Sequence, residues 1–188
     1  MDELSKLKKY FPFLIPLTSI FFIIFLVLLV NNSSADAEVI GEYFFRKPFE
    51  DSTVYGISSP FGSRKDPFGG DSILFHNGLD LSAPMGTNVI SIGDGEVYEI
   101  GFDPMGLGNY VYIKHDFGGL IYYSAYGHML NDSIVVEKGQ NIKIGTKIGE
   151  VGSTGNSTGY HLHLTILDRE LIFDKDHLLD PYSVIDGL

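Results

Sequence analysis

The stretch that decides the fold class is Tyr110–His115 (YVYIKH), Asp116–Gly119 (DFGG) and Leu120–Tyr126 (LIYYSAY). Two runs rich in β-branched and aromatic residues flank a short segment that contains two adjacent glycines. This pattern is typical of two antiparallel strands joined by a tight turn. We therefore predict a β-hairpin from Tyr110 to Tyr126.

Similar patterns continue on both sides of this hairpin. Asn88–Ile92 (NVISI), Gly93–Gly95 (GDG) and Glu96–Ile100 (EVYEI) predict a second hairpin. Further β-rich runs are Val135–Val136, Ile142–Ile144, Lys147–Val151 and His161–Leu167. No long segment after Ser58 keeps the 3.6-residue period of an amphipathic helix. We predict an all-β domain over residues 58–188, built on an antiparallel sheet.

The N-terminal 30 residues have a different character. Residues 1–10 are polar and contain Lys6, Lys8 and Lys9, whereas residues 11–30 are apolar apart from Thr18, Ser19 and two prolines. Twenty residues at ~1.5 Å per residue span a hydrocarbon core of ~30 Å. Because the lysines precede the span, we expect the N-terminus in the cytoplasm and the later residues outside. The prediction is a cytoplasmic segment (1–10), a transmembrane anchor (11–30) and a tether (31–57).

A cleaved signal peptide is the alternative to a retained anchor. Ala35-Asp36-Ala37 has the small-x-small form of a cleavage site, and cleavage after Ala37 would release the domain. The apolar run is longer than the usual signal core of about 7–15 residues, which favours the anchor. Either way the domain is delivered across the cytoplasmic membrane, to the periplasm or cell wall.

Composition excludes several classes of function. The chain has no cysteine, so disulfides, thiolate metal sites and cysteine nucleophiles are excluded. The formal charge is −11, and residues 38–188 carry all of it, with ten bases against twenty-one acids. A basic footprint for nucleic acid is missing. Because the chain has no cysteine, any metal ion must be held by histidine and carboxylate.

Three short motifs contain four of the six histidines. In His76-Asn-Gly-Leu-Asp80 we expect Gly78 to turn the backbone so that His76 and Asp80 converge. In His161-Leu-His163, residues two apart in a strand project from the same face. One of these two imidazoles can bind a metal while the other transfers protons.

The third motif, Tyr126-Gly-His128, brings another imidazole to the end of the predicted hairpin. Histidine and carboxylate suit Zn²⁺, and three protein ligands leave a fourth tetrahedral position open, as in catalytic sites. Zinc lowers the pKa of a bound water to about 7, and a nearby histidine can take its proton.

These motifs resemble the lysostaphin-like, or LytM-domain, zinc endopeptidases of the M23 peptidase family. The resemblance runs from about Ser58 to about Leu167 and includes Ser59–Pro67 (SPFGSRKDP), the His76-x-Gly-x-Asp80 motif and Gly152–His163 (GSTGNSTGYHLH). It implies an antiparallel sheet with a loop-walled groove, and it implies peptidoglycan peptides as substrate.

The resemblance also assigns roles to individual residues. His76, Asp80 and His163 correspond to the ligands of one Zn²⁺, while His128 and His161 correspond to the pair that handles the proton and the developing oxyanion. Two departures are visible. Gly127 stands where alanine is common, and Leu74-Phe75 stand where some members have a tyrosine.

The sequence therefore predicts a membrane-anchored zinc metalloendopeptidase that hydrolyses peptide bonds of peptidoglycan. The alternative is a non-catalytic LytM-type scaffold or activator of other cell-wall hydrolases. The run Gly145–Gly152 also resembles a biotin- or lipoyl-type carrier, but Lys114 and Lys138 lack the methionine neighbours of a carrier lysine.

Overall fold

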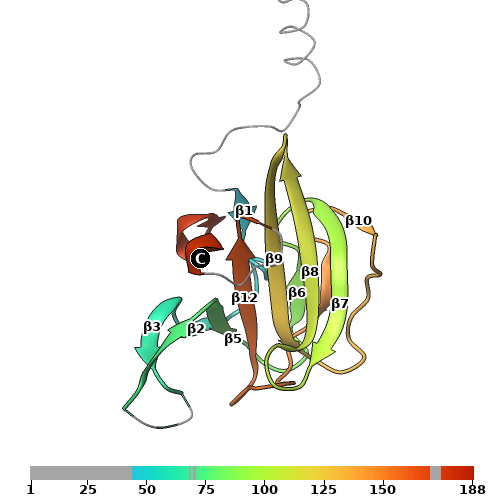
Figure 1. Cartoon of the computed structure of the whole chain (residues 1–188). Coiled ribbons are helices and arrows are strands. Elements are labelled where there is room, and N and C mark those ends of the chain that lie inside the picture. The colour runs from blue at the N-terminus through green and yellow to red at the C-terminus, as the bar shows by residue number, and fades with distance from the viewer. Residues whose placement is uncertain (1–43, 68, 70, 170–174) are drawn as a thin grey trace, which may run out of the picture. The chain divides into compact units, whose positions relative to one another are not determined.

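Strands β8 (Gly108–Phe117) and β9 (Leu120–Met129) form the predicted long hairpin (Figure 1). In this computed structural model Phe117 pairs with Leu120, and Gly118 and Gly119 form the two-residue loop. Both glycines have positive φ angles, 69° and 98°. A two-residue hairpin turn of type I′ requires such angles, and glycine adopts them without steric cost. The prediction of this hairpin is confirmed.

The main sheet is antiparallel and has eight strands within the residues that the structure describes, which are 44–67, 69, 71–169 and 175–188. Its order is β10-β7-β8-β9-β12-β5-β2, with β13 paired to β12. The remaining strands of this sheet are β2 (Gly56–Ser59), β5 (Leu79–Ser82), β7 (Gly95–Asp103), β10 (Asn141–Ile142), β12 (His161–Leu167) and β13 (Leu178–Leu179). The predicted antiparallel all-β fold is confirmed.

Three two-stranded sheets complete the described domain. β1 (Phe45–Arg46) pairs in parallel with β14 (Ile185–Asp186), while the pairs β3–β4 and β6–β11 are antiparallel. Their strands are β3 (Gly62–Lys65), β4 (Ile73–His76), β6 (Asn88–Ile90) and β11 (Lys147–Glu150). Helical structure in the described residues consists of two 3₁₀ turns, η1 (Lys175–His177) and η2 (Pro181–Ser183).

The predicted membrane anchor, residues 11–30, lies outside the described residues. Among the residues that are described, none forms a helix with the length and apolar character needed to cross a bilayer.

Strand β12 shows how the hydrophobic core orients the groups on its opposite face. Leu162 and Leu164 are 1% and 0% exposed and belong to the main core cluster, together with Leu79 and Leu81 of β5. Burial of each such side chain contributes about 1.5–3 kcal/mol. Because side chains alternate along a strand, a shift of one residue would turn these leucines to solvent and the intervening histidines into the core.

Residues 44–49, which fall in the predicted tether, pack on the domain. Phe45 and Phe49 are 2% and 1% exposed and belong to the main core cluster. The ring of Phe45 lies 4.9 Å from that of His115, and the ring of Phe44 lies 5.7 Å from that of Phe117. The folded domain therefore includes these residues, ahead of Ser58.

The predicted hairpin across Gly93–Gly95 is wrong. β6 pairs with β11, whereas β7 pairs with β8 and β10. The intervening Asp94 accepts hydrogen bonds from Lys143 Nζ at 2.7 Å and from Ile144 N at 2.8 Å, so it is anchored to a distant turn. A Cβ at Gly95 would lie 2.4 Å from the carbonyl oxygen of Lys114. These glycines allow close packing instead of a hairpin turn.

His115 is a buried histidine outside the predicted site. Its Nδ1 lies 2.8 Å from the carbonyl oxygen of Asp94, and its Nε2 lies 2.8 Å from Ser124 Oγ. The hydroxyls of Ser124 and Tyr126 are 3.1 Å apart, and Tyr126 also accepts a hydrogen bond from Ile92 N. Burial lowers the pKa of His115 to about 4, although the bond to Asp94 opposes the shift. The imidazole is therefore neutral at neutral pH.

This burial makes stability depend on pH. An unfolded histidine has a pKa of about 6.5, so between pH 6.5 and 4 the unfolded chain binds the proton more tightly than the folded chain. The stability from neutral His115 is thus present above pH 6.5 and is lost as the pH falls toward 4. Between pH 7 and 4.5, we expect the free energy of unfolding of the native chain to fall by roughly 2–3 kcal/mol more than that of His115→Gln. Urea denaturation at both pH values measures this difference, and equal losses in the two proteins would contradict it.

Candidate metal site and groove

The pairing register of β12 brings the predicted ligands together. His163 lies opposite Asp80 of β5 on one side and opposite Gly127 of β9 on the other. His76 ends β4, and two residues separate it from the start of β5. As a result His76 Nε2 lies 3.1 Å from Asp80 Oδ1 and 3.2 Å from His163 Nδ1, and the latter two atoms are 2.8 Å apart.

At Gly78 of the His76-x-Gly-x-Asp80 motif there is no room for a side chain next to β12. A Cβ at this position would lie 2.6 Å from His163 Nε2 and 2.7 Å from the carbonyl oxygen of Leu164. Gly78 is not among the glycines with positive φ. The chain bends at Gly78, as predicted, but without a positive φ angle, and the missing side chain also lets β12 approach.

The two histidine ligands are oriented by hydrogen bonds on their far sides. His76 Nδ1 lies 2.8 Å from the carbonyl oxygen of Pro60, so Nδ1 carries the proton and Nε2 presents its lone pair. His163 Nε2 lies 3.0 Å from Thr165 Oγ1. In the tautomer that donates Nε2–H to Thr165, His163 Nδ1 presents a lone pair to the same point. Such partners fix ring orientation and tautomer at metal sites.

Asp80 is held as a carboxylate by its neighbours. Its Oδ2 accepts a hydrogen bond from Arg64 Nη1 at 3.2 Å, and Arg64 also donates to the Ser59 hydroxyl. Burial alone raises the pKa of Asp80, but the adjacent imidazoles of His163 and His76 outweigh it and hold the pKa below its usual range. Burial lowers the pKa of His163, although Asp80 opposes this shift. The cluster therefore combines an ionised carboxylate with a neutral imidazole.

The donor set fits a divalent metal ion. His76, Asp80 and His163 are buried, and one ligand atom of each lies within 4.8 Å of the others. Tetrahedral zinc with bonds of ~2.0–2.1 Å separates its ligand atoms by ~3.3 Å, only a few tenths of an ångström more than the distances found here. In these tautomers three lone pairs converge on one point, and a bound cation would stabilise them. Three such ligands would leave a coordination position of a tetrahedral ion free for water or substrate.

His128 and His161 stand next to this cluster, with ring centres 4.6 Å apart. His128 Nδ1 lies 2.8 Å from the carbonyl oxygen of Thr154, and His161 Nδ1 lies 2.9 Å from that of Gly159. In each ring Nδ1–H donates to the carbonyl, so the Nε2 atom is left for chemistry. His161 Nε2 lies 3.6 Å from Asp80 Oδ1.

The backbone of His128 is constrained. Its φ angle is 59°, a left-handed conformation that non-glycine residues rarely adopt and that is concentrated at functional sites. The backbone N–H of His128 donates to the carbonyl oxygen of Leu107. Burial lowers the pKa of the imidazole to about 4, against the effect of the bond to Thr154, so this ring is neutral at neutral pH. The five predicted site residues are thus all brought together.

Two loops interlock to hold His128. Thr154 Oγ1 accepts from Asn109 N and donates to the carbonyl oxygen of Met129, both at 2.9 Å. A Cβ at Gly108 would lie 2.3 Å from the carbonyl carbon of Thr154, and one at Gly155 would lie 2.2 Å from Gly108 N. This contact between backbones fixes the carbonyl group to which His128 Nδ1 donates.

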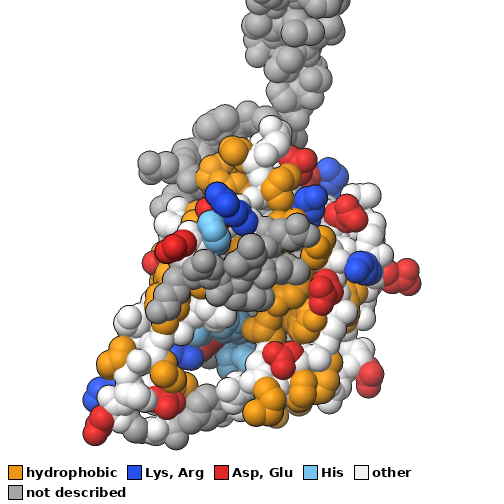
Figure 2. Space-filling model, viewed as in Figure 1, with side chains coloured by type: hydrophobic (Ala, Val, Ile, Leu, Met, Phe, Trp, Pro, Cys, Tyr) orange, Lys and Arg blue, Asp and Glu red, His pale blue; other side chains and the backbone are white. Residues whose placement is uncertain are grey.

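A groove of about 440 Å³ lies over the site. The β3–β4 hairpin forms one wall, where Leu74 and Phe75 are 44% and 38% exposed. Residues 103–107 and 156–158 contribute the opposite wall. Figure 2 shows histidine side chains in a hollow between these two parts, with basic and acidic side chains beside them. The predicted loop-walled groove is present.

Sequence reasoning missed several supporting residues. Arg64 lies in the Ser59–Pro67 motif, but the motif alone assigns no role to it. Thr165 follows His163 by two residues in a strand and so shares its face, a signal that was available. The carbonyl groups of Pro60 and Thr154 carry no signal in the sequence.

Solved structures with this fold define the class of protein. A zinc-containing peptidase from Vibrio cholerae superposes with a TM-score of 0.60 at 36% identity, over 72% of this chain and 38% of that one. The catalytic domain of lysostaphin from Staphylococcus simulans gives a TM-score of 0.57 at 28% identity, over 69% of this chain and 90% of that domain. The fold is that of the lysostaphin-type peptidases.

Sequence comparison then identifies the family. The pattern of Peptidase family M23 matches residues 74–178, which include all five site residues, and the chain belongs to this family. A relative is peptidoglycan DD-endopeptidase ShyB of Vibrio cholerae, which is 41% identical over 120 residues. The match covers 63% of this chain and 26% of ShyB, so the chain corresponds to about a quarter of that protein.

Thr165 provides a test of the metal site. Thr165→Val keeps the shape of this fully buried side chain but leaves His163 Nε2–H without an acceptor. We expect zinc affinity to fall on the order of 10-fold, as for other partners of metal-binding histidines. Competition with a zinc-chelating dye measures the affinity, and Thr165→Ser, which keeps the hydroxyl, should retain it. Equal affinity in the valine variant would contradict the assigned role of Thr165.

Proposed function

We propose that the chain is a zinc metalloendopeptidase that hydrolyses peptide bonds of peptidoglycan, with one Zn²⁺ held by His76, Asp80 and His163. The observation that carries this proposal is the convergence of these three ligand atoms, beside two further imidazoles, on the floor of a groove. Membership of Peptidase family M23 supports the reaction. The name of ShyB, a peptidoglycan DD-endopeptidase, supports a bond between D-amino acids as the target.

Zinc bound at this site would supply Lewis-acid activation of water and of the peptide carbonyl. The chain's own residues supply the rest. Pro60 and Thr165 hold the two ligand imidazoles, and Arg64 holds Asp80. The site therefore reaches its binding geometry before substrate arrives, and this lowers the cost of organising it during the reaction.

His128 is the proposed proton acceptor. Its Nδ1–H is committed to Thr154, so the neutral ring has a lone pair on Nε2, and among the described residues no carboxylate lies within ion-pair distance of this ring. The same nitrogen can return the proton to the leaving amine, which is what general acid–base catalysis of amide hydrolysis needs.

His161 is the proposed donor to the carbonyl oxygen. Its Nδ1–H is committed to Gly159, so Nε2 would donate only from the imidazolium form, whose charge Asp80 Oδ1 at 3.6 Å would stabilise. An N–H aimed at the point where negative charge develops stabilises the transition state.

We propose a location in the cytoplasmic membrane, with a single span at residues 11–30, the N-terminus inside and the enzyme domain outside. The lysines before the apolar run and the length of the run support this orientation. Cleavage after Ala37 is the alternative and would secrete the domain. Fractionation of cells that express the full chain separates a membrane-bound form from a shorter released form.

The direct test is digestion of purified peptidoglycan. The full chain, purified in mild detergent, is incubated with peptidoglycan with and without a zinc chelator, and new amino termini in the released fragments are identified by mass spectrometry. Chelator-sensitive release is the expected result, and it identifies the bond. Zinc bound at one ion per chain without any release would overturn the proposal in favour of the non-catalytic scaffold or activator.

Two histidine variants separate metal binding from proton transfer. His163→Ala removes a ligand, so we expect zinc and activity to be lost together. His128→Ala should keep zinc but lose about 10²–10⁴-fold in turnover, the usual contribution of general acid–base catalysis. Zinc content is measured by elemental analysis, and turnover by release of amino termini.

The matched control for these variants is His177→Ala. His177 lies in η1, where it pairs with Asp168 outside the groove, and its removal should change neither quantity. Stoichiometric zinc in His163→Ala, or full activity in His128→Ala, would show that the corresponding role is assigned to the wrong residue.

A further inference from the structure

Arg64 is the basic side chain of the groove. Among the described residues that line the groove, it is the only lysine or arginine, and its side chain is 24% exposed. It comes from β3, in the hairpin that forms one wall. The domain has a large excess of acidic residues, so this cation in the groove is a candidate to bind an anionic group.

The hydrogen bonds of Arg64 use only part of its guanidinium. Its Nη1 donates to Asp80 Oδ2 and to the Ser59 hydroxyl. An arginine has five N–H donors in a planar fork that matches a carboxylate. Within the described residues, Nε and Nη2 of Arg64 donate no hydrogen bond. Since Arg64 lines the groove, these N–H donors are candidates to bind a molecule there.

The position of Arg64 limits where a bound carboxylate would lie in the substrate. Arg64 holds one oxygen of Asp80 while the other oxygen belongs to the metal cluster, so a single carboxyl group separates the guanidinium from the cluster. An extended peptide advances ~3.3–3.6 Å per residue. A substrate carboxylate that binds Arg64 therefore belongs to the residue adjacent to the cleaved bond or to the next residue along the peptide.

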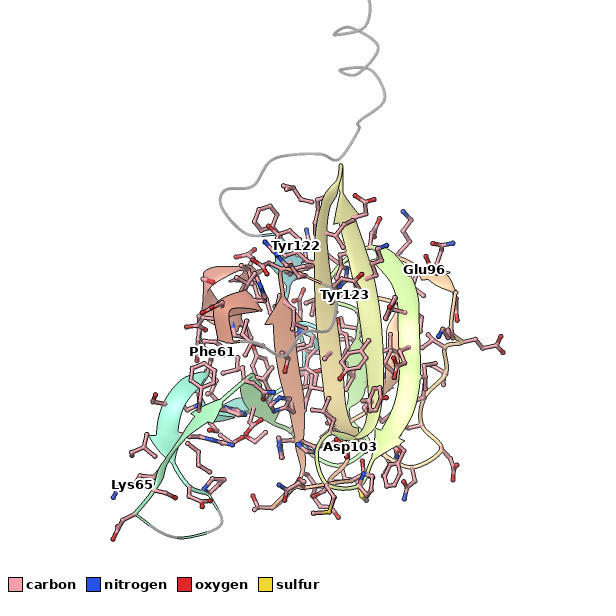
Figure 3. The ribbon with its side chains drawn as sticks, viewed as in Figure 1. Phe61, Lys65, Glu96, Asp103, Tyr122 and Tyr123 are labelled. Atoms are coloured by element: carbon pink, nitrogen blue, oxygen red, sulfur yellow. The ribbon has the colours of Figure 1, made fainter. Side chains whose placement is uncertain are left out.

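The opposite wall has the opposite charge. Asp103, at the end of β7, lines the groove and is exposed. Figure 3 shows Asp103 on the other side of β12 from the β3–β4 hairpin. A carboxylate is repelled by that wall and attracted by Arg64, so the two walls orient a charged peptide along one direction.

We propose that Arg64 binds the α-carboxylate of the residue whose amine is released. This inference rests on the proposed function and narrows its substrate class. The favoured peptides carry a free carboxylate on the carbon attached to the scissile nitrogen, as at a D-Ala–D-amino acid bond with a free C-terminal end. A bond inside a glycine bridge has no such group and is disfavoured.

The test uses a matched pair of ligands that cannot be cleaved. Both are stem peptides in which a methylene-amine replaces the amide between the last two D-alanines, and one ends in the acid while the other ends in the amide. Binding to the zinc-loaded full chain is measured by isothermal titration calorimetry. We expect the acid to bind on the order of 10-fold more tightly, because a charge-assisted hydrogen bond to arginine is available only to it.

Two variants of β3 identify the source of this preference. Arg64→Gln should reduce the ratio of acid to amide affinity to about one. Lys65→Gln removes the same charge from the next residue, which does not line the groove and lies at the outer part of the hairpin (Figure 3), and it should keep the ratio. If Arg64 only supports Asp80, its loss weakens both ligands equally and leaves the ratio unchanged, which would overturn the inference.

A third ligand distinguishes the C-terminal carboxylate from the free carboxylate of the internal D-glutamate. It has D-isoglutamine in place of the internal D-glutamate, so that only the C-terminal acid is retained, and it should bind Arg64 as tightly as the parent. If this ligand binds more weakly than the parent, and Arg64→Gln removes that difference, Arg64 binds the D-glutamate carboxylate. That result would overturn its assignment to the residue whose amine is released.

The inference and the proposed function can fail separately. Equal affinity for acid and amide in the native chain, with peptidoglycan still digested, would overturn the inference alone, and this comparison needs no variant to fold. An Arg64-dependent preference without digestion of any peptidoglycan would overturn the proposed function but keep the carboxylate site.

Discussion

The register of β12 between β5 and β9 is the constraint on which the rest of the site depends. It sets His163 opposite Asp80 and opposite Gly127, which directly precedes His128. The register is enforced from the other face, where Leu162 and Leu164 are buried in the core. The hydrophobic effect therefore fixes the position of polar groups that it does not itself stabilise, and the enzyme site draws its precision from ordinary packing.

Electrostatics then tune what the register has assembled. Asp80 is buried, yet the adjacent imidazoles of His163 and His76 keep it ionised, while Arg64 donates a hydrogen bond to its other oxygen. His128 stays neutral because it is buried, and a carbonyl group sets its tautomer. These states are the ones that metal binding and proton transfer need at neutral pH. Apart from His76, which is four residues from Asp80, the neighbours that act on these groups lie far away in the sequence.

This separation in sequence explains which features could be predicted. The alternation in His161-Leu-His163 and the hairpin across Gly118-Gly119 are local patterns with a direct physical reading, and the structure has both. The segment Gly93–Gly95 has an equally good local signal for a hairpin, but Asp94 is anchored to Lys143 and Ile144, and long-range contacts override the signal. The support that Thr165, Pro60 and Arg64 give to the ligands likewise arises only from tertiary contacts.

The two walls of the groove differ in how freely they can change. The wall near Thr154 is locked, because the backbones at Gly108 and Gly155 are in contact and the same contact holds His128. The opposite wall is a separate two-stranded sheet, connected to the main sheet through the ends of β3 and β4. Replacement of the exposed Leu74 and Phe75 can therefore alter selectivity while His76 and Arg64 of the same hairpin stay in place, whereas changes at Gly108 or Gly155 would disturb the support of His128.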